Sequence, residues 1–269
     1  MAESTEGIVL RRIDYSETSL VVHFYTPDFG QVGALAKGAK RPKSAFQGGV
    51  DVLTRNQIVF ARREPGGLAT LMESAILDDY LPLRSDLGRL IRAQYCAELV
   101  SLLTVEEDAC PPLYGLLVET LERLASGKGD AVTHTLRFEM GILAAAGYEV
   151  DWDRCVACER ALTPRESAFL SSSAGGVVCA RCAGSLAERA ALAPGARSAA
   201  RILSVGGPRA ERLHLSQGQT RPLGQALSQT ITYVAGRPPR MLKYVERFAA
   251  SGRRKAPSRG GKEVQVGPR

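Results

Sequence analysis

The chain has 269 residues, a formal net charge of +7 and an ordinary apolar content, which is enough for two or three small domains. No stretch approaches the roughly 18 apolar residues of a membrane span, so we expect no membrane partner. The first six residues carry acids and no apolar signal region, so we expect a cytoplasmic protein.

The positive charge is concentrated at the C-terminal end of the chain. Residues 237–269 contain ten Lys and Arg residues and two acids, a net +8, so the rest of the chain carries −1. A basic segment of this kind favours a nucleic-acid partner, although a solubilising role is equally compatible with the composition.

The first 80 residues show the pattern of a small β-barrel. Short apolar runs are separated by turn residues such as Thr26-Pro27-Asp28-Phe29-Gly30. The runs predict five strands, at 7–10, 20–25, 31–37, 52–62 and 68–77. Five strands of this length are typical of an OB-fold, and an SH3-like barrel would give a similar pattern.

After Leu81-Pro82 the apolar period changes to that of helices. The pattern predicts an α-helical domain over 81–250, so the fold class is α+β, with helices near 87–102, 113–124, 132–143, 184–204, 223–234 and 241–248. Ser85 is the expected N-cap of the first helix, and Cys96 is expected to be a buried apolar residue. The segment 251–269 lacks apolar residues and is predicted to be a disordered basic tail.

Two Cys-x-x-Cys pairs interrupt the helical pattern, in a segment at about 151–183. They comprise Cys155, Cys158, Cys179 and Cys182, with 20 residues between the pairs. This spacing is typical of a closed four-cysteine zinc site, which leaves no position for water or substrate and therefore indicates a structural metal. Two disulfides would need an oxidising compartment, and a thioredoxin-like centre would need only one pair.

A basic loop is predicted between the third and fourth strands. Its cations are Lys37, Lys40, Arg41 and Lys43, and Phe46 follows them. Loops of such barrels often flank a nucleic-acid groove, so these cations are candidate phosphate contacts and Phe46 a candidate stacking residue. A solvated surface loop is the alternative interpretation.

Residues that could carry catalysis do not form a recognisable set. The three histidines, His23, His134 and His214, are scattered, and no phosphate-binding loop motif occurs. We therefore expect a protein that is not an enzyme.

The sequence resembles the bacterial RecO family of recombination mediators, in its zinc-bearing form. The likeness is carried by Gly7–Leu10, Tyr15–Val22, Phe24–Gly30 and Lys37–Ser44, and by the four cysteines. The resemblance implies an OB-fold, structural Zn²⁺, and Lys37, Lys40, Arg41 and Lys43 in the DNA-facing loop of the barrel.

The resemblance also implies partners and a process. RecO-like proteins bind single- and double-stranded DNA, anneal complementary strands and, with RecR, help RecA load on single strands coated by the single-stranded-DNA-binding protein SSB. They are nucleoid-associated, and they bind the acidic C-terminal tail of SSB through the helical domain. Candidate contacts for that tail or for DNA are Arg237, Arg240, Lys243 and Arg247.

Two other functions are compatible with parts of the sequence. An OB-fold RNA-binding protein would share the barrel and the charge, but the helical domain with its cysteine insert fits it less well. A metal-dependent nucleic-acid enzyme would need catalytic ligands beyond the four cysteines, and the sequence offers none.

Overall fold

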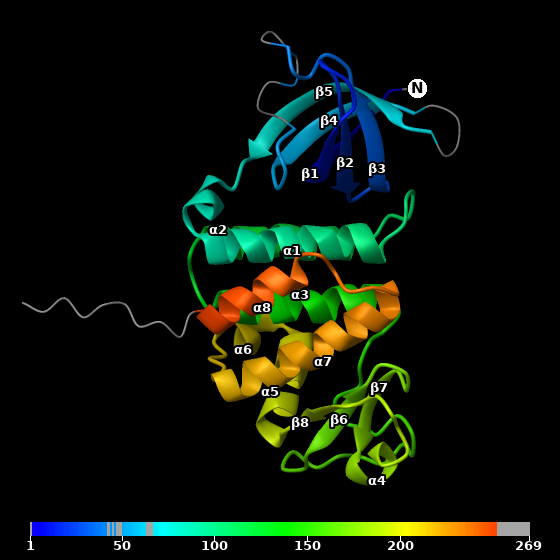
Figure 1. Ribbon diagram of the computed structural model, residues 1–269, viewed down its shortest axis with the longest axis vertical. Coiled ribbons are helices and arrows are strands. Elements are labelled where there is room, and N and C mark those ends of the chain that lie inside the picture. Colours follow the sequence, from blue (N-terminus) through cyan, green and yellow to red (C-terminus); the bar gives the residue numbers. More distant parts are fainter. Residues whose placement is uncertain (1, 42–43, 45, 47–49, 63–66, 252–269) are drawn as a thin grey trace, which may run out of the picture.

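The computed structural model describes residues 2–41, 44, 46, 50–62 and 67–251. The predicted tail beyond 251 and the predicted DNA contact Lys43 lie outside these residues. A β-barrel forms one end of the molecule, a small β-sheet forms the other, and helices lie between them (Figure 1). Within the described ranges, no helix combines the length and apolar character that a membrane crossing needs.

The barrel is a closed five-stranded sheet in the order β1-β2-β3-β5-β4, which confirms the predicted OB-type architecture. Its strands are β1 (Ala2–Asp14), β2 (Leu20–Thr26), β3 (Gly30–Ala36), β4 (Arg55–Ala61) and β5 (Ala69–Asp78). All neighbours are antiparallel except β3 and β5, which pair in parallel at Ala34 and Ala69. The first strand begins five residues before its predicted start, because residues 2–6 pair with the end of β4.

Side chains of alternate strand residues fill the barrel. Val22, Phe24, Ile58 and Phe60 are fully buried, as the period-2 pattern of their strands requires. Phe46 folds back into the same cluster and is only 6% exposed. The expectation that Phe46 stacks on bases is therefore wrong, because its ring is part of the barrel core.

The helical domain follows a short 3-10 helix, η1 (Leu81–Ser85). Its helices are α1 (Leu87–Leu103), α2 (Pro111–Ala125), α3 (Ala131–Ala145), α5 (Pro194–Val205), α6 (Gly207–Glu211), α7 (Gln217–Ala235) and α8 (Leu242–Ser251). Asp86, not Ser85, caps α1 by accepting the backbone N–H of Arg89 at 3.1 Å. The helix predicted over 184–204 begins only at Pro194, because residues 190–192 form a strand.

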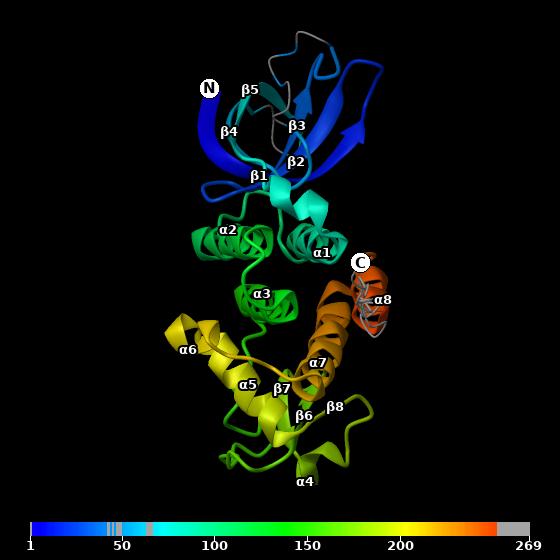
Figure 2. The ribbon, with the colours of Figure 1, turned by 90° about the vertical axis from the view of Figure 1, so that its left-hand side faces the viewer.

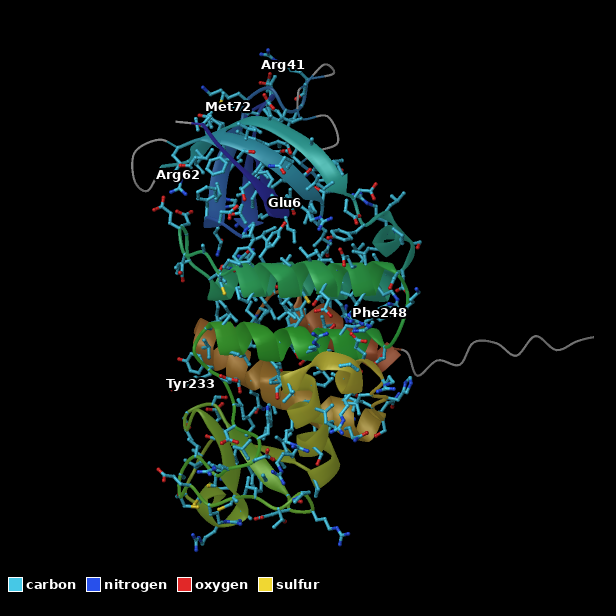
Figure 3. All side chains as sticks on the ribbon, turned by 180° about the vertical axis from the view of Figure 1, so that it is seen from behind. Glu6, Arg41, Arg62, Met72, Tyr233 and Phe248 are labelled. Carbon is cyan, nitrogen blue, oxygen red and sulfur yellow. The ribbon has the colours of Figure 1, made fainter. Side chains whose placement is uncertain are left out.

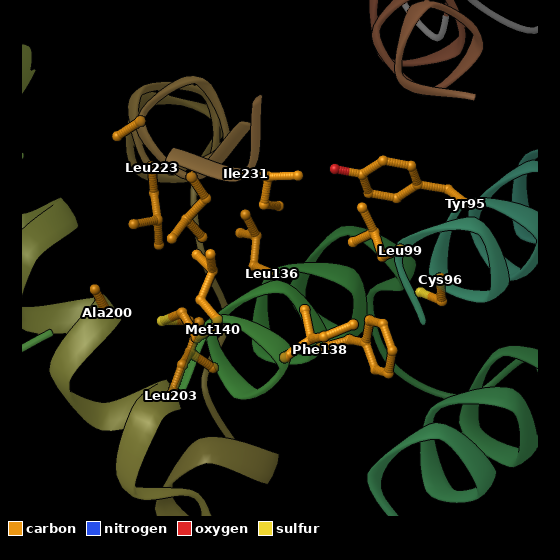
Figure 4. Packing of buried hydrophobic residues seen from close by; sticks show 14 of the residues in the cluster. Tyr95, Cys96, Leu99, Leu136, Phe138, Met140, Ala200, Leu203, Leu223 and Ile231 are labelled. Carbon is orange, nitrogen blue, oxygen red and sulfur yellow. The ribbon is translucent and has the colours of Figure 1, made fainter. Parts of the chain in front are cut away.

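Helix α3 is the centre of the helical domain and packs against α1, α2, α5 and α7. Leu136 and Met140 of α3 lie in one cluster with Leu203 of α5 and Ile231 of α7 (Figure 4). Within this apolar core the carboxylate of Glu139 accepts a hydrogen bond of 2.8 Å from the Tyr95 hydroxyl. Cys96, as predicted, is fully buried among apolar neighbours.

The end of the barrel that faces the helical domain packs on helices α1 and α2. The rings of Tyr25 and Tyr114 lie 6.3 Å apart, and the Tyr114 hydroxyl donates to Glu6 Oε2 at 3.3 Å. At the edge of the contact, Gln31 Nε2 donates to the carbonyl oxygen of Thr104 at 2.7 Å. These contacts join three barrel strands to α2 and to the residue that caps α1, so they fix the orientation of the barrel.

Gly30 begins β3 where the loop between α1 and α2 crosses the barrel. Its φ is +62°, and a Cβ atom there would lie 2.3 Å from the carbonyl oxygen of Asp108. Only glycine fits both the backbone conformation and the close approach of the loop.

We expect Gly30→Ala to destabilise the protein strongly, as measured by urea unfolding. Gly127→Ala is the matched control, because Gly127 has φ +70° but nothing within 4 Å of the added Cβ. The control should lose about 1–2 kcal/mol from the left-handed backbone alone, and Gly30→Ala should lose more. Equal losses would show that the loop contact does not constrain this position.

Candidate metal centre and nucleic-acid interface

The four predicted metal ligands come together at the end of the molecule farthest from the barrel. Their Sγ atoms all lie within 4.8 Å of one another, although the two pairs are 20 residues apart in the chain. A tetrahedral zinc site with bonds of about 2.3 Å separates its sulfurs by about 3.8 Å. The spacing therefore fits one zinc ion held by all four cysteines.

A small sheet positions the two cysteine pairs. It has the order β7-β6-β8, formed by β6 (Ala168–Ser171), β7 (Gly176–Cys179) and β8 (Ala190–Leu192). Cys179 ends β7 and Cys182 lies on the short helix α4 (Ala180–Ala183), so a strand-to-helix turn presents both sulfurs to the same side. The sheet extends nine residues past the predicted limit of this segment at 183.

The other pair lies on a tight turn beside β7. Cys155 N–H donates to the carbonyl oxygen of Arg160 at 3.0 Å, and the Val156 N–H donates to Val177 of β7 at 2.8 Å. Glu159 closes the turn with a φ of +58°. These backbone bonds hold the first pair of sulfurs against the second.

Hydrogen bonds favour the thiolate of one cysteine in each pair, Cys155 and Cys179, and the thiolate is the form that binds zinc, whereas hydrogen bonds with the other sulfurs raise the pKa of Cys182. Burial raises the pKa of the Cys155 thiol, but backbone N–H groups, including that of Cys179 at 3.3 Å, outweigh burial and lower it. A backbone hydrogen bond from Cys182 lowers the pKa of the Cys179 thiol. The donor set and its surroundings thus fit a structural Zn²⁺.

Two arginines contact the sulfurs from outside the cluster. The Arg160 guanidinium, which pairs with Glu166, interacts with the Cys179 sulfur, and the Arg181 guanidinium interacts with that of Cys158. Four thiolates around Zn²⁺ carry a net charge of about −2, which these guanidinium groups offset. Sequence spacing alone did not indicate either arginine, because they act through the folded turn.

The predicted basic loop lies at the end of the barrel away from the helices, where Figure 3 labels Arg41. Lys37, Lys40 and Arg41 are exposed and share one turn, which the Arg41 N–H closes by donating to Gly38 at 3.0 Å. Lys40 Nζ also lies 2.9 Å from Asp14 Oδ1. The structure therefore brings three of the four predicted loop cations together.

The predicted cations of the C-terminal segment lie on a different surface. Arg237 and Arg240 are in the link between α7 and α8, and Lys243 and Arg247 are on α8; all four are exposed. In Figures 1 and 2, α8 lies on the side of α1 away from the barrel. These four residues and the basic loop thus form two separate positive surfaces.

A groove between α3 and α5 was not indicated by the sequence. It has a volume of about 170 Å³, and its lining is mainly apolar, including Met140, Trp152 and Leu203. Arg137 also lines the groove, and Val205, which is 83% exposed, lies at its edge. The two helices are some 60 residues apart in the chain, so only the folded protein reveals the groove.

The described architecture defines a class of protein: an OB-fold barrel joined to a helical domain that carries a four-cysteine metal centre. Two known protein families match this architecture, one for each part of the chain. The family described as "Recombination protein O N terminal" matches residues 1–80, and "Recombination protein O C terminal" matches residues 84–243.

Individual relatives agree with the family match. The DNA repair protein RecO of Desulfatibacillum aliphaticivorans is 30% identical over 247 residues, which cover 90% of this chain and 96% of the relative. That of Halalkalibacterium halodurans is 32% identical over 182 residues, 68% of this chain and 69% of the relative. That of Rhodopirellula baltica is 34% identical over 177 residues, 65% of each chain.

The chain belongs to the RecO family of DNA repair and recombination proteins, which confirms the resemblance.

We expect Cys155→Ala to abolish stoichiometric zinc binding, measured by elemental analysis of the purified protein. Its thermal unfolding temperature should also fall, because the small sheet would lose the metal that holds its turns together. Cys110→Ala is the control: Cys110 is a free cysteine outside the cluster and should leave the zinc content unchanged. Full zinc occupancy in Cys155→Ala would contradict the four-cysteine assignment.

Proposed function

We propose that this protein is a DNA repair and recombination mediator that binds single- and double-stranded DNA and anneals complementary strands without a covalent step. The observation that carries this proposal is the exposed cluster of Lys37, Lys40 and Arg41 at the free end of an OB-type barrel. Lys43 follows in sequence and is proposed as a fourth contact. Membership of the RecO family supports the same conclusion.

The proposed mechanism is electrostatic. Lysine and arginine side chains neutralise phosphates and release bound counterions, so affinity falls as salt rises. Two complementary strands held on positive surfaces of one protein repel each other less and meet at a higher local concentration, which favours annealing. Zinc has no part in these steps, because a four-cysteine site has no open coordination position.

The proposed partners are those that the family resemblance implies. We propose that the protein acts with RecR to help RecA load on single strands coated by SSB, and that it contacts the acidic tail of SSB. An acidic peptide needs a cation beside an apolar groove. The groove between α3 and α5 has Arg137 in its lining, paired with Glu119 at 2.7 Å, and also the acidic Glu149, so the proposal requires the peptide to compete with Glu119 for Arg137.

We expect replacement of Lys37, Lys40, Arg41 and Lys43 by glutamine to weaken DNA binding alike for all sequences. The dependence of log affinity on log salt should become shallower by about 3 for single strands, because about 0.7 counterions are released per phosphate contact. Fluorescence anisotropy with a labelled oligonucleotide at several salt concentrations measures both quantities.

The matched control removes the same amount of charge elsewhere. Arg154, Arg165, Arg209 and Arg221 are exposed and have no ion pair with another described residue. Their replacement by glutamine should change affinity and slope less. Equal effects would mean that net charge, not the loop, determines binding, and tight RNA binding without DNA annealing would favour an RNA-binding function.

We expect Val205→Glu to weaken binding of a peptide with the sequence of the SSB tail, because it adds a negative charge at the edge of the apolar groove. Leu87→Glu is the control, since Leu87 is 62% exposed and does not line the groove. Isothermal titration calorimetry should show at least a tenfold loss for the first variant only. Unchanged affinity of Val205→Glu would place the peptide elsewhere.

A further inference from the structure

Both ends of α8 are anchored on α1, which determines which face of α8 meets solvent. Before the first turn of α8, the Glu98 carboxylate accepts the backbone N–H groups of Arg240 and Met241, each at 2.7 Å. Toward its other end, the Phe248 ring packs on Gly88, where a Cβ atom would lie 2.4 Å from the ring. The outer face of α8 is therefore a fixed surface.

That fixed surface carries a net positive charge, because four exposed cations in the segment 237–247 outnumber the one exposed acid there, Glu246. Arg237, Arg240, Lys243 and Arg247 are exposed, and none has a carboxylate within 4.0 Å among the described residues. The Glu98 carboxylate is occupied by backbone N–H groups instead. Clustered like charges of this kind create a field that attracts an anionic partner.

One exposed aromatic ring contacts these cations, and a second precedes them in the chain at the end of α7. Tyr244 is 42% exposed and Tyr233, at the end of α7, is 50% exposed. Lys243 Nζ lies 4.9 Å from the centre of the Tyr244 ring. Cations that track a backbone, together with rings on which bases stack, are the combination that binds single-stranded nucleic acid.

An acidic peptide is the competing partner for this surface, and the structure favours it less. The α3–α5 groove is lined in part by Leu227 of α7, but by no residue of α8. A second pocket, of about 220 Å³, lies between the barrel and α1. Neither of these two pockets is lined by a residue of the segment 233–248, so neither offers this surface an apolar cavity that could anchor a peptide side chain.

We propose that this surface, formed by Tyr233, Arg237, Arg240, Lys243, Tyr244 and Arg247 and here called the α8 surface, binds a second single strand by phosphate contacts and base stacking. The proposal rests on the proposed function, in which the barrel loop holds a first strand. Helix α1 separates the α8 surface from the barrel (Figure 1). Two strands therefore occupy different surfaces of one rigid support until they pair.

The test uses two variants of the full chain. The ring variant is Tyr233→Ser with Tyr244→Ser, and the charge variant is Arg237→Gln, Lys243→Gln and Arg247→Gln. The probes are a labelled deoxythymidine oligomer and a mixed-sequence duplex of the same length. Both variants should keep the thermal unfolding temperature, because the side chains that they change are exposed.

The ring variant should bind the single strand at least fivefold more weakly than the wild type does. Its affinity for the duplex should be unchanged, because duplex bases stack on one another and cannot stack on protein rings. The charge variant should weaken both probes and reduce the single-strand salt slope by about 2. Annealing should slow in both variants.

Wild-type single-strand affinity in the ring variant would overturn the proposal. So would variants that bind an acidic peptide more weakly but bind DNA as the wild type does. The loop variant with Lys37, Lys40, Arg41 and Lys43 replaced separates this result from a failure of the proposed function. Binding lost in the loop variant and unchanged in both α8 variants would reject the α8 surface alone. Weaker single-strand binding in the ring variant, together with wild-type DNA affinity in the loop variant, would support the α8 surface and reject the loop assignment.

Discussion

The contact between the barrel and helices α1 and α2 determines how the two ends of the molecule are oriented relative to each other. Tyr25, Tyr114 and Glu6 form its buried part, and Gln31 and Gly30 hold its edge against the loop after α1. Because three barrel strands contact α2 and the residue that caps α1, the barrel cannot turn on the helices without breaking several contacts together. Every candidate surface thus keeps a constant position relative to the others.

The segment with the four cysteines and the sheet β7-β6-β8, here called the cysteine lobe, depends less on the barrel contact than on the metal that its cysteines could bind. Three strands of three or four residues bury too little apolar surface to be stable alone. A metal held by Cys155 and Cys179, which lie 24 positions apart in the chain, would supply the missing constraint. Helices α3, α5 and α7 pack on one another directly, so the lobe is an addition to a helical core that is already continuous.

Sequence reasoning succeeded where the signal is local. The barrel strands, most helices and the four cysteines follow from periodicity and spacing, which neighbouring residues determine. It failed where distant segments decide the structure: β8 is a strand because Ala190 pairs with Leu170, and Phe46 is buried because its side chain packs against the barrel core. The α3–α5 groove and the exposed rings beside the α8 cations needed the packing of separate helices, which no single stretch encodes.

The buried pair of Tyr95 and Glu139 makes the stability of the helical core depend on pH. Burial raises the pKa of the Glu139 carboxyl to about 7, while the Tyr95 hydrogen bond and the charge of Arg92 lower it. The unfolded chain has the ordinary carboxyl pKa near 4.5, so folding takes up a proton between the two values. The stability that Glu139 contributes therefore falls as pH rises from about 4.5 to about 7, so α3, on which α1, α2, α5 and α7 pack, is held more firmly at acidic than at neutral pH.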